Sequence, residues 1–528
     1  MKIPLLNNVI RSFCVNLALT VLSVLLFAGS FPNLLIEHGF PFFAWIAYAP
    51  IFLLLYRVSL GASVFWGALY GYTAYTLFNY WLTAFHPLAG LIVGCVYLAY
   101  NAALFFCLKL AVILFPRRGY LVQWVIWLAY EYLRTKGFLG YSYGITGYSQ
   151  WRVIPLIQIA GIFGVWGVSA LVVFPSAWLG ALLGSGRREK IPVIAWAVAL
   201  IAALCYGLIS PADYSSAPVA RIALIQHNTD PWKGGIEQYR ANYVTLKRLS
   251  DEALAAQPKP DMVVWSETAF VPRIYWHETY RDDQPSWVLV KELLEYLAAQ
   301  DVPFVIGNDD ARKDPAKNPR AAEDYRIDYN AVMLFEQGKV AGLYRKLHLV
   351  PFTEHFPYEK QLPFIHRMLV NADTHFWEQG SEAMVFKGPG FSFSTPICFE
   401  DTFGYLSRRF VQNGADLIVN LSNDAWSHSL PAQNQHLSMA VFRAVENGRS
   451  MVRSTASGQT CGVTPNGNVI ALATPFTEAA LTVAIPIVKN DTLYTRRGDY
   501  LAAGFTIMAA ALLLFGAVLS IITKRRKI

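Results

Sequence analysis

The chain has 528 residues, of which 54% are hydrophobic and only 15% are charged, and its formal net charge is +8. Ordinary soluble proteins contain about 25% charged residues, so this composition excludes a typical soluble protein and favours a membrane protein. Much of the basic excess lies in short segments between apolar stretches, and membrane topology explains that pattern better than nucleic-acid binding does.

Long apolar stretches come first along the chain. A hydrocarbon core about 30 Å thick requires roughly 20 apolar residues per helix. This criterion predicts eight spans, at about residues 12–30, 39–56, 60–85, 88–115, 120–134, 154–184, 192–210 and 500–523. The fifth is short and contains Glu131. The first could also be a cleaved signal peptide, although further spans follow it at once.

The basic residues suggest an orientation for these spans. Most of them lie at 2–11, 57, 117–118, 187–190 and 524–527, which eight spans place on one side of the membrane, the cytoplasm. Arg134, Lys136 and Arg152 are exceptions. We therefore expect a membrane domain of seven helices at 1–215, an outer domain at 216–490, and a final helix with a basic cytoplasmic tail at 491–528.

The outer domain contains alternating strand and helix patterns. Strands are predicted at 219–226, 261–267, 302–308, 391–398 and 415–423, with two more inside 329–346 around Gln337 and Gly338 and a hairpin at 458–472. Helices are predicted at 236–254, at 287–300 and between the strands that end at 398 and begin at 415. Long loops are predicted after residue 308 and over 355–377. This mixture indicates an α/β sandwich.

Three polar residues share one placement in this domain. Glu267, Lys346 and Cys398 each lie at or just past the end of an apolar strand. Taken singly, they are ordinary surface charges and a core thiol. Ligands in α/β folds collect outside the carboxyl ends of strands, and together the three residues would supply a base, an electrostatic stabiliser and a nucleophile.

No pattern in the chain predicts a cofactor or a metal. Cys398 and Cys461 are the two cysteines of the outer domain and could form one disulfide in an oxidising compartment. There is no paired Cys and His spacing, no HExxH, and no GxGxxG or Walker motif.

The segments WSET, YRKLHLVPFTE, ICFED and NLSNDAW, around Glu267, Lys346, Cys398 and Trp426, resemble the nitrilase (carbon–nitrogen hydrolase) superfamily. The resemblance is closer to its membrane branch, the apolipoprotein N-acyltransferases, which GYSQ at 147–150 and QHLSMAVFRAVENGR at 435–449 also resemble. It covers nearly the whole chain. The branch commonly has Gly where Thr353 stands, an aromatic residue where Ser427 stands and often Tyr where Phe399 stands, which leaves loop shape and acyl-chain contacts in doubt but not the triad.

The resemblance implies an αββα sandwich and a Glu-Lys-Cys triad of Glu267, Lys346 and Cys398. Cys398 would attack a phospholipid ester to form a thioester, and the α-amine of a diacylglyceryl-cysteine apolipoprotein would then take the acyl group. The enzyme would be a monomer in a bacterial inner membrane, with its outer domain on the periplasmic side.

Five further residues are expected around the triad. Phe399 is expected to supply a backbone donor for the oxyanion, and Glu354 could hydrogen-bond Lys346 or the leaving group. Glu400 would cap the element after Cys398. By resemblance, Trp232 and Trp426 lie near the site.

Two other functions fit parts of the sequence. A membrane-anchored amidase that uses water as its acceptor would have the same triad, but a tether needs only one span. A transporter would carry charges within its spans, and between Val58 and Pro116 the only charged side chain is Lys109. The apolar residues of 355–377, including Phe364, Ile365 and Met368, favour a lid that rests on the bilayer over an ordinary core flap.

Overall fold

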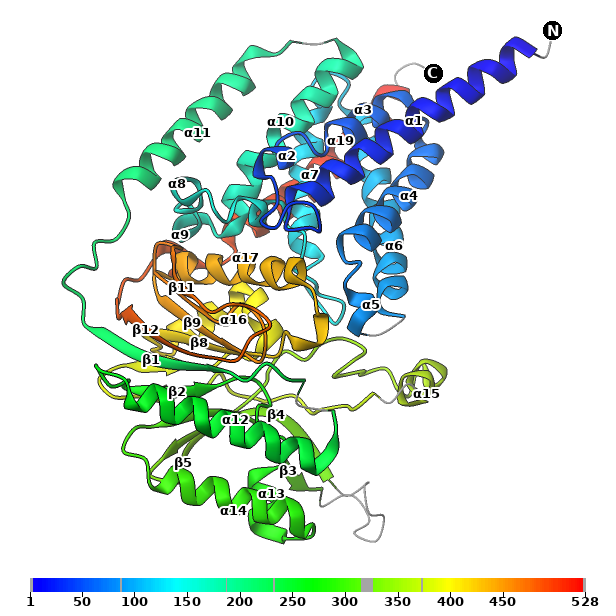
Figure 1. Cartoon of the computed structure of the whole chain (residues 1–528). Helices are drawn as coiled ribbons and strands as arrows, with labels where there is room; N and C mark the ends of the chain where they lie inside the picture. Colours follow the sequence, from blue (N-terminus) through cyan, green and yellow to red (C-terminus); the bar gives the residue numbers. More distant parts are fainter. Residues whose placement is uncertain are drawn as a thin grey trace. The chain divides into compact units, whose positions relative to one another are not determined.

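The computed structural model describes residues 3–85, 88–186, 188–230, 233–314, 326–371 and 374–525 (Figure 1). The chain divides into two compact units. The first comprises Met1–Pro211, Ser429–Phe442 and Arg497–Ile528, and the second comprises Ala212–His428 and Arg443–Arg496. Helix α17 (Leu430–Asn447) therefore contributes residues to both.

The first unit is helical. Its other elements are α1 (Ile3–Ser30), α2 (Pro41–Ala44), α3 (Ala49–Arg57), α4 (Leu60–Phe78), α5 (Leu82–Phe85), α6 (Ala89–Leu114), α7 (Gly119–Leu133), η1 (Thr146–Gln150), α8 (Ile154–Ile157), α9 (Ala160–Phe163), α10 (Val165–Ser185), α11 (Lys190–Ile209) and α19 (Tyr500–Arg525).

Among the described residues, five helices are long and apolar enough to cross a membrane: α1 from Asn8, α6, α10, α11 and α19 up to Thr523. The predicted count of eight is thus not confirmed. The apolar stretch 39–56 forms two short helices, and α7, with 15 residues, is about 22 Å long at 1.5 Å per residue. That length is less than a hydrocarbon core of about 30 Å.

Proline and glycine divide two of the predicted spans. Pro41 and Pro50 stand in the first turns of α2 and α3, where a missing backbone N–H costs nothing. The stretch 154–184, predicted as one span, begins as two short helices and becomes continuous only after Gly164, whose φ of +66° is left-handed. Hydrophobicity alone does not reveal these interruptions, because the residues around them are apolar.

The first unit nevertheless contains buried charged side chains. Lys109 donates from Nζ to the carbonyl of Leu55 at 2.8 Å. Glu131 and Arg134 are 2% and 3% exposed. The scarcity of charges between Val58 and Pro116 therefore does not extend to the whole unit, and it does not exclude a transporter.

The second unit contains two six-stranded sheets. The first sheet has the order β12-β1-β2-β3-β4-β5 and the second the order β11-β10-β9-β8-β7-β6. Their strands are β1 (Val219–Gln226), β2 (Met262–Trp265), β3 (Phe304–Lys313), β4 (Arg326–Glu336), β5 (Lys339–Arg345), β6 (Val385–Lys387), β7 (Ser392–Ser394), β8 (Leu417–Ser422), β9 (Ser450–Thr455), β10 (Cys461–Val463), β11 (Val469–Leu472) and β12 (Ala479–Pro486).

The two sheets are linked and covered as a layered α/β fold. Ser454 on β9 donates to the carbonyls of Ile225 and Val264 in the first sheet. Helices α12 (Gly235–Ala255) and α14 (Gln284–Ala298) bury Leu246 and Leu293 in a core with β1 to β4, and Figure 1 shows both helices on the outer side of that sheet. The remaining helices of the unit are α13 (Ile274–Tyr280), α15 (Pro363–Asn371), α16 (Gly404–Gln412), α18 (Leu493–Arg497), η2 (Cys398–Thr402) and η3 (Ala425–Ser427).

Two predicted loops are partly regular. Strand β3 continues past residue 308 to Lys313, which pairs with Arg326 of β4, because the polar residues there complete a hairpin ladder. The stretch 355–377 contains α15, whose leucine, Leu369, is buried while Phe364 is 72% exposed. The residues of α15 have an amphipathic pattern, and such a pattern favours a helix over the loop that was predicted here.

The β4–β5 hairpin has a defined register. Gln337 and Gly338 form its turn with φ of +50° and +74°. The register shifts by one residue between Leu334 and Phe335, which marks a β-bulge. Beyond the shift, Ala331 lies opposite Arg345.

Candidate active site

The strand directions bring two of the predicted residues to one edge of the first sheet. Strand β3 is parallel to β2, and two antiparallel steps through β4 give β5 the same direction as β2. Glu267 follows the carboxyl end of β2 by two residues, and Lys346 directly follows β5. Their side chains meet there, since Nζ of Lys346 lies 3.3 Å from Oε1 of Glu267.

A second carboxylate completes the surroundings of this lysine. Nζ of Lys346 donates to Oε1 of Glu354 at 2.8 Å, and Oε2 of Glu354 accepts from the backbone N–H of Val350 at 2.9 Å. Lys346 is fully buried. Burial alone would lower its pKa, but the negative charges of Glu354 and Glu267 outweigh that effect and raise the pKa above its ordinary value. The lysine is therefore a permanent cation at neutral pH.

Two donors fix the carboxylate of Glu267. Asn330 donates from Nδ2 to Oε1 at 2.8 Å, and the backbone N–H of Asn423 donates to Oε2 at 2.9 Å. The backbone N–H of Lys346 also donates to the carbonyl of Asn330, so the same asparagine holds both charged residues. Sequence reasoning missed Asn330 and Asn423. Only the facing positions of Asn330 and Lys346 in the hairpin could have indicated the first.

Cys398 lies at the start of η2, at a turn rather than inside a strand. The strand β7 ends at Ser394, and Ile397 forms a single bridge to Leu421 of β8. Cys398 has a left-handed φ of +48°, a strained conformation for a residue other than glycine. Its side chain is partly exposed, and Nδ2 of Asn420 donates to its carbonyl at 3.4 Å.

Charged neighbours act on the Cys398 thiol in opposite directions. Desolvation raises the pKa of Cys398 well above its usual value, the Glu267 carboxylate raises it further, and the Lys346 ammonium lowers it. The resting sulfur is therefore a thiol. Attack by this sulfur needs a base that removes the proton during the reaction, which a carboxylate in this position can do.

Glu400 connects the Cys398 turn to the Lys346 loop. Its carboxylate accepts from the backbone N–H groups of Ile397, Leu347 and His348 at 2.7, 2.7 and 3.0 Å. The hydroxyl of Tyr344 also donates to it at 2.8 Å. Burial raises the pKa of Glu400 to about 7 against the opposing effect of these donors. The residue thus caps η2, as predicted from its position, and also ties the lysine loop to that turn.

The other predicted neighbours have different surroundings. Phe399 is buried and its ring packs edge-on against Phe403 at 5.0 Å between centroids. Trp426 is partly exposed in η3. Trp232 lies outside the described residues. Asp401 forms a fully buried ion pair with Arg453.

Comparisons with known proteins identify the family of the chain. A family model described as carbon-nitrogen hydrolase matches residues 221–490, and one described as apolipoprotein N-acyltransferase N-terminal domain matches residues 23–178. Apolipoprotein N-acyltransferase 1 of Treponema denticola is 46% identical, with 95% of this chain and 96% of the relative covered. Apolipoprotein N-acyltransferase 1 of Treponema pallidum is 46% identical, with 96% of each covered.

The chain belongs to the apolipoprotein N-acyltransferase family. A relative from Geobacter metallireducens with the same name is 32% identical over 93% of this chain and 94% of its own length. Among solved structures, an amidase variant from Nesterenkonia sp. AN1 is 17% identical, with a TM-score of 0.38, and covers 56% of this chain and 99% of its own.

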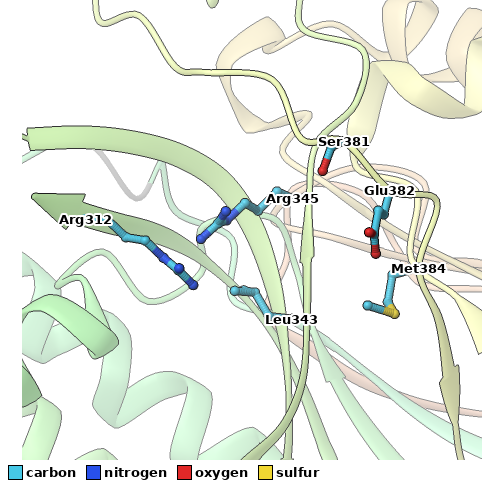
Figure 2. A pocket seen from close by; sticks show the side chains of 6 residues that line it. All are labelled: Arg312, Leu343, Arg345, Ser381, Glu382 and Met384. Atoms are coloured by element: carbon cyan, nitrogen blue, oxygen red, sulfur yellow. The ribbon is translucent and has the colours of Figure 1, made fainter. Parts of the chain in front are cut away.

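This member of the apolipoprotein N-acyltransferase family also has an open cleft that is lined by none of the three predicted residues. The cleft is about 160 Å³ in volume. Figure 2 shows the side chains that line it: Arg312, Leu343, Arg345, Ser381, Glu382 and Met384. Both arginines contact the single carboxylate of Asp310, at 3.5 and 2.5 Å, which balances one of their two positive charges.

The described residues include no group of three or more His, Cys, Asp or Glu side chains that could hold a metal ion. Cys398 and Cys461 are both free thiols rather than a disulfide. Cys461 is fully buried on β10, and burial raises its pKa to about 12. It therefore fits an inert core position.

Proposed function

We propose that this chain transfers an acyl chain from a phospholipid, through a thioester on Cys398, to the α-amine of a diacylglyceryl-cysteine apolipoprotein. The observation that carries the mechanism is the position of the Lys346 ammonium, which contacts Glu267 at 3.3 Å and Glu354 at 2.8 Å while its charge acts on the Cys398 thiol. The Lys346 charge thus acts on the proposed base, Glu267, and on the proposed nucleophile, Cys398, at the same time.

The first half of the reaction forms the thioester. Glu267 takes the thiol proton as the sulfur of Cys398 attacks the ester carbonyl carbon, and a tetrahedral oxyanion forms. The Lys346 ammonium and the backbone N–H of Phe399 stabilise that charge, and one such donor is typically worth about 3 kcal/mol in the transition state. The carbon–oxygen bond then breaks, and Glu267 returns its proton to the departing lysophospholipid oxygen.

The second half transfers the acyl group. The amine of the acceptor cysteine attacks the thioester carbonyl, Glu267 accepts an amine proton, and the carbon–sulfur bond breaks. The proton passes to the Cys398 sulfur, which restores the resting thiol. Throughout, the Glu354 carboxylate remains a negative partner of Lys346. Glu267 can therefore gain and lose a proton while the lysine beside it stays charged.

Mass spectrometry of the purified protein incubated with phospholipid tests this proposal. We expect an acyl adduct on the peptide that contains Cys398, removable by hydroxylamine. Cys398→Ala should fold without forming the adduct, whereas Cys461→Ala should keep it. An adduct that persists in Cys398→Ala, or never forms in the wild-type protein, contradicts the mechanism. Release of free fatty acid in place of an N-acylated peptide would identify water as the acceptor, as in an amidase.

The membrane arrangement is a second part of the proposal. The five long apolar helices, the basic segments and the family membership support a protein of the bacterial inner membrane. We propose eight crossings, both termini in the cytoplasm, residues 216–490 in the periplasm and a monomeric enzyme. Labelling of single cysteines placed at Lys527 and Asp314 tests the orientation, and the arrangement is wrong if both positions are accessible from the same side.

The segment from residue 355 to residue 371, called the flap below, is proposed to meet the acyl chains of the donor. Phe364 is 72% exposed and Leu362 46% exposed. Exposed large apolar side chains on a short helix and just before it favour contact with lipid over packing within the protein.

A further inference from the structure

Two residues that flank the flap, Glu354 before it and Trp377 after it, are hydrogen-bonded to each other. The chain enters it after Glu354 and returns through a segment that includes Trp377, whose backbone N–H donates to the carbonyl of Glu354 at 2.9 Å. The side chain of Glu354 binds the Lys346 ammonium at 2.8 Å. The neck of the flap, meaning Glu354 and Trp377, therefore includes a partner of the proposed catalytic lysine.

The side chain of Trp377 attaches this neck to the first sheet. Its indole Nε1 donates to Oδ2 of Asp309 at 3.1 Å. Asp309 lies on β3 opposite Asn330, and Asn330 is the residue that donates to Glu267. Trp377 thus joins the neck to β3, and β3 pairs with the strand of Asn330, which holds both Glu267 and Lys346.

Neighbouring contacts fix the rest of the returning segment. The backbone N–H of Glu378 donates to the carbonyl of Asp328 at 2.9 Å, and that of Gly380 donates to the carbonyl of Lys346 at 2.8 Å. Nε2 of His375 lies 3.1 Å from Oδ2 of Asp328. These bonds hold the backbone near the sheet, and Trp377 adds a bond to Glu354 through its N–H and one to Asp309 through its indole.

Asp309, which accepts the indole hydrogen bond, is a buried carboxylate, and its burial costs free energy of folding. Asp309 is 1% exposed, and its Oδ1 has no hydrogen-bond partner in the described structure. Burial raises the pKa of Asp309 to about 6, so the carboxylate exists at neutral pH at a free-energy cost. An apolar residue would pack there at lower cost. The carboxylate at this position therefore contributes through the bond that it accepts from Trp377.

We propose that Trp377 is a positioning residue, which through its bond to Asp309 fixes the neck of the flap and so keeps Glu354 on Lys346. The inference deepens the proposed function and rests on it for the role of Lys346. Its consequence is that displacement of the flap by an acyl chain would be transmitted to the charge balance of the lysine.

The charges around Lys346 give this idea a measurable signature. The titratable groups that act on or respond to the ammonium are Glu267, Glu354, Cys398, Glu400 and His348. Among them, Glu354 contributes most to raising the pKa of Lys346. If Glu354 moves away, that pKa falls, the lysine loses its proton at lower pH, and the alkaline limb of the acylation rate moves to lower pH.

The test compares Trp377→Phe, which removes the indole donor and reduces the ring size, with Trp276→Phe, which makes the same change elsewhere in the full-length protein. Trp276 is a matched control because its Nε1 also donates to a carboxylate, Oδ2 of Asp282, at 2.7 Å. The rate of Cys398 acylation is measured from pH 6 to pH 10. We expect Trp377→Phe to lower the rate by up to about 100-fold, the cost of misplacing a catalytic group by about 1 Å, and to shift the alkaline limb in the direction that Glu354→Gln shifts it.

A double variant and hydrogen exchange complete the test. Trp377→Phe combined with Glu354→Gln should be no slower than Glu354→Gln alone, because both changes act through one contact. The backbone amide hydrogen of residue 377 should exchange with solvent faster in Trp377→Phe than in the wild-type protein. A pH profile like that of Trp276→Phe, additive losses, or an unchanged amide would each overturn the proposal. If wild-type Cys398 is never acylated, the proposed function fails, and the amide measurement still decides whether Trp377 fixes the neck.

Discussion

Both units bury a basic side chain, and they stabilise it in opposite ways. In the second unit, Lys346 lies between two carboxylates, Glu267 and Glu354. In the first unit, NH1 of Arg134 donates to the hydroxyl of Tyr97 and to the carbonyls of Tyr141 and Tyr143 at 2.7, 3.1 and 2.8 Å. The rings of Tyr75, Tyr97 and Tyr130 also lie within 6 Å of its guanidinium.

The difference separates a cation suited to chemistry from one suited to structure. Neutral carbonyls and aromatic rings hold Arg134 with fixed partners that cannot exchange protons at neutral pH. Carboxylates can exchange them, so Lys346 lies among groups whose charge can change during a reaction. A buried charge alone therefore does not mark an active site.

The largest predicted effect contrasts two buried carboxylates. Glu267→Gln should slow thioester formation by about 1000-fold, because an amide cannot accept the thiol proton. Glu131→Gln in the first unit should change it only a few-fold, since an amide oxygen can still accept from the backbone and hydroxyl of Thr146. Intact-protein mass spectrometry over time gives both rates. Equal losses would remove the proposed distinction between the two units.

A second prediction concerns Glu400, the buried charge of the second unit that neutral donors surround. Its pKa is raised to about 7 from an ordinary value of 4.5. The stability that this group contributes is therefore fully present below pH 4.5 and is lost as the pH rises through 7, a change of up to about 3 kcal/mol. Relative to Glu400→Gln, the wild-type melting temperature should fall between pH 5 and pH 8. A relative rise would mean that the backbone donors dominate over burial.

Charge-conserving exchanges sharpen the comparison of the two cations. Lys346→Arg should lower acylation by about 100-fold with a small loss of stability, because a planar fork does not replace a point charge between two carboxylates. Arg134→Lys should lower the free energy of unfolding by about 2 kcal/mol, because an ammonium cannot reach all three acceptors. Protein that remains folded should keep most of its activity. Melting curves and rates of both variants, measured in one detergent, test the contrast.

The smallest predicted effect lies on the two exposed apolar surfaces. Replacement of Phe364, Ile365 and Met368 by Ser should lower activity on bilayer phospholipid by about tenfold more than on a short soluble ester. The control is Leu514→Ser on α19, where the leucine is 69% exposed but belongs to the first unit. It should affect both substrates equally. Equal losses for the flap variant would indicate ordinary packing of the flap.

The residues that follow strand ends were easier to predict from the sequence than the residues that donate hydrogen bonds to them. Glu267, Lys346 and Cys398 follow apolar strands, a local pattern. Asn330 was missed because its role depends on the pairing of β4 with β5, which no local pattern shows. The N–H of Asn423 was missed because any residue has one, so its identity carries no signal.

The fold was predicted where periodicity and burial agree. Strand β1 and helix α12 were found within a residue of their ends. Strand β9 was missed because its buried run Ser450–Thr455 contains Arg453 and Ser454, whose polar groups bond to residues distant in the chain. The count of eight spans is not confirmed, because the apolar stretch 39–56 forms two short helices and α7 has only 15 residues, and hydrophobicity alone does not show where a helix stops.

The bulge between Leu334 and Phe335 has a consequence for how this hairpin can change in length. Successive side chains of a strand point to opposite faces, so a slip of one residue between β4 and β5 would turn Lys346 away from Glu267. The bulge accounts for one odd residue already. A single-codon insertion or deletion between Ala331 and Lys346 should therefore inactivate the enzyme, while a change of two codons at the Gln337–Gly338 turn should be tolerated. Natural variation in the length of this hairpin should accordingly occur in steps of two.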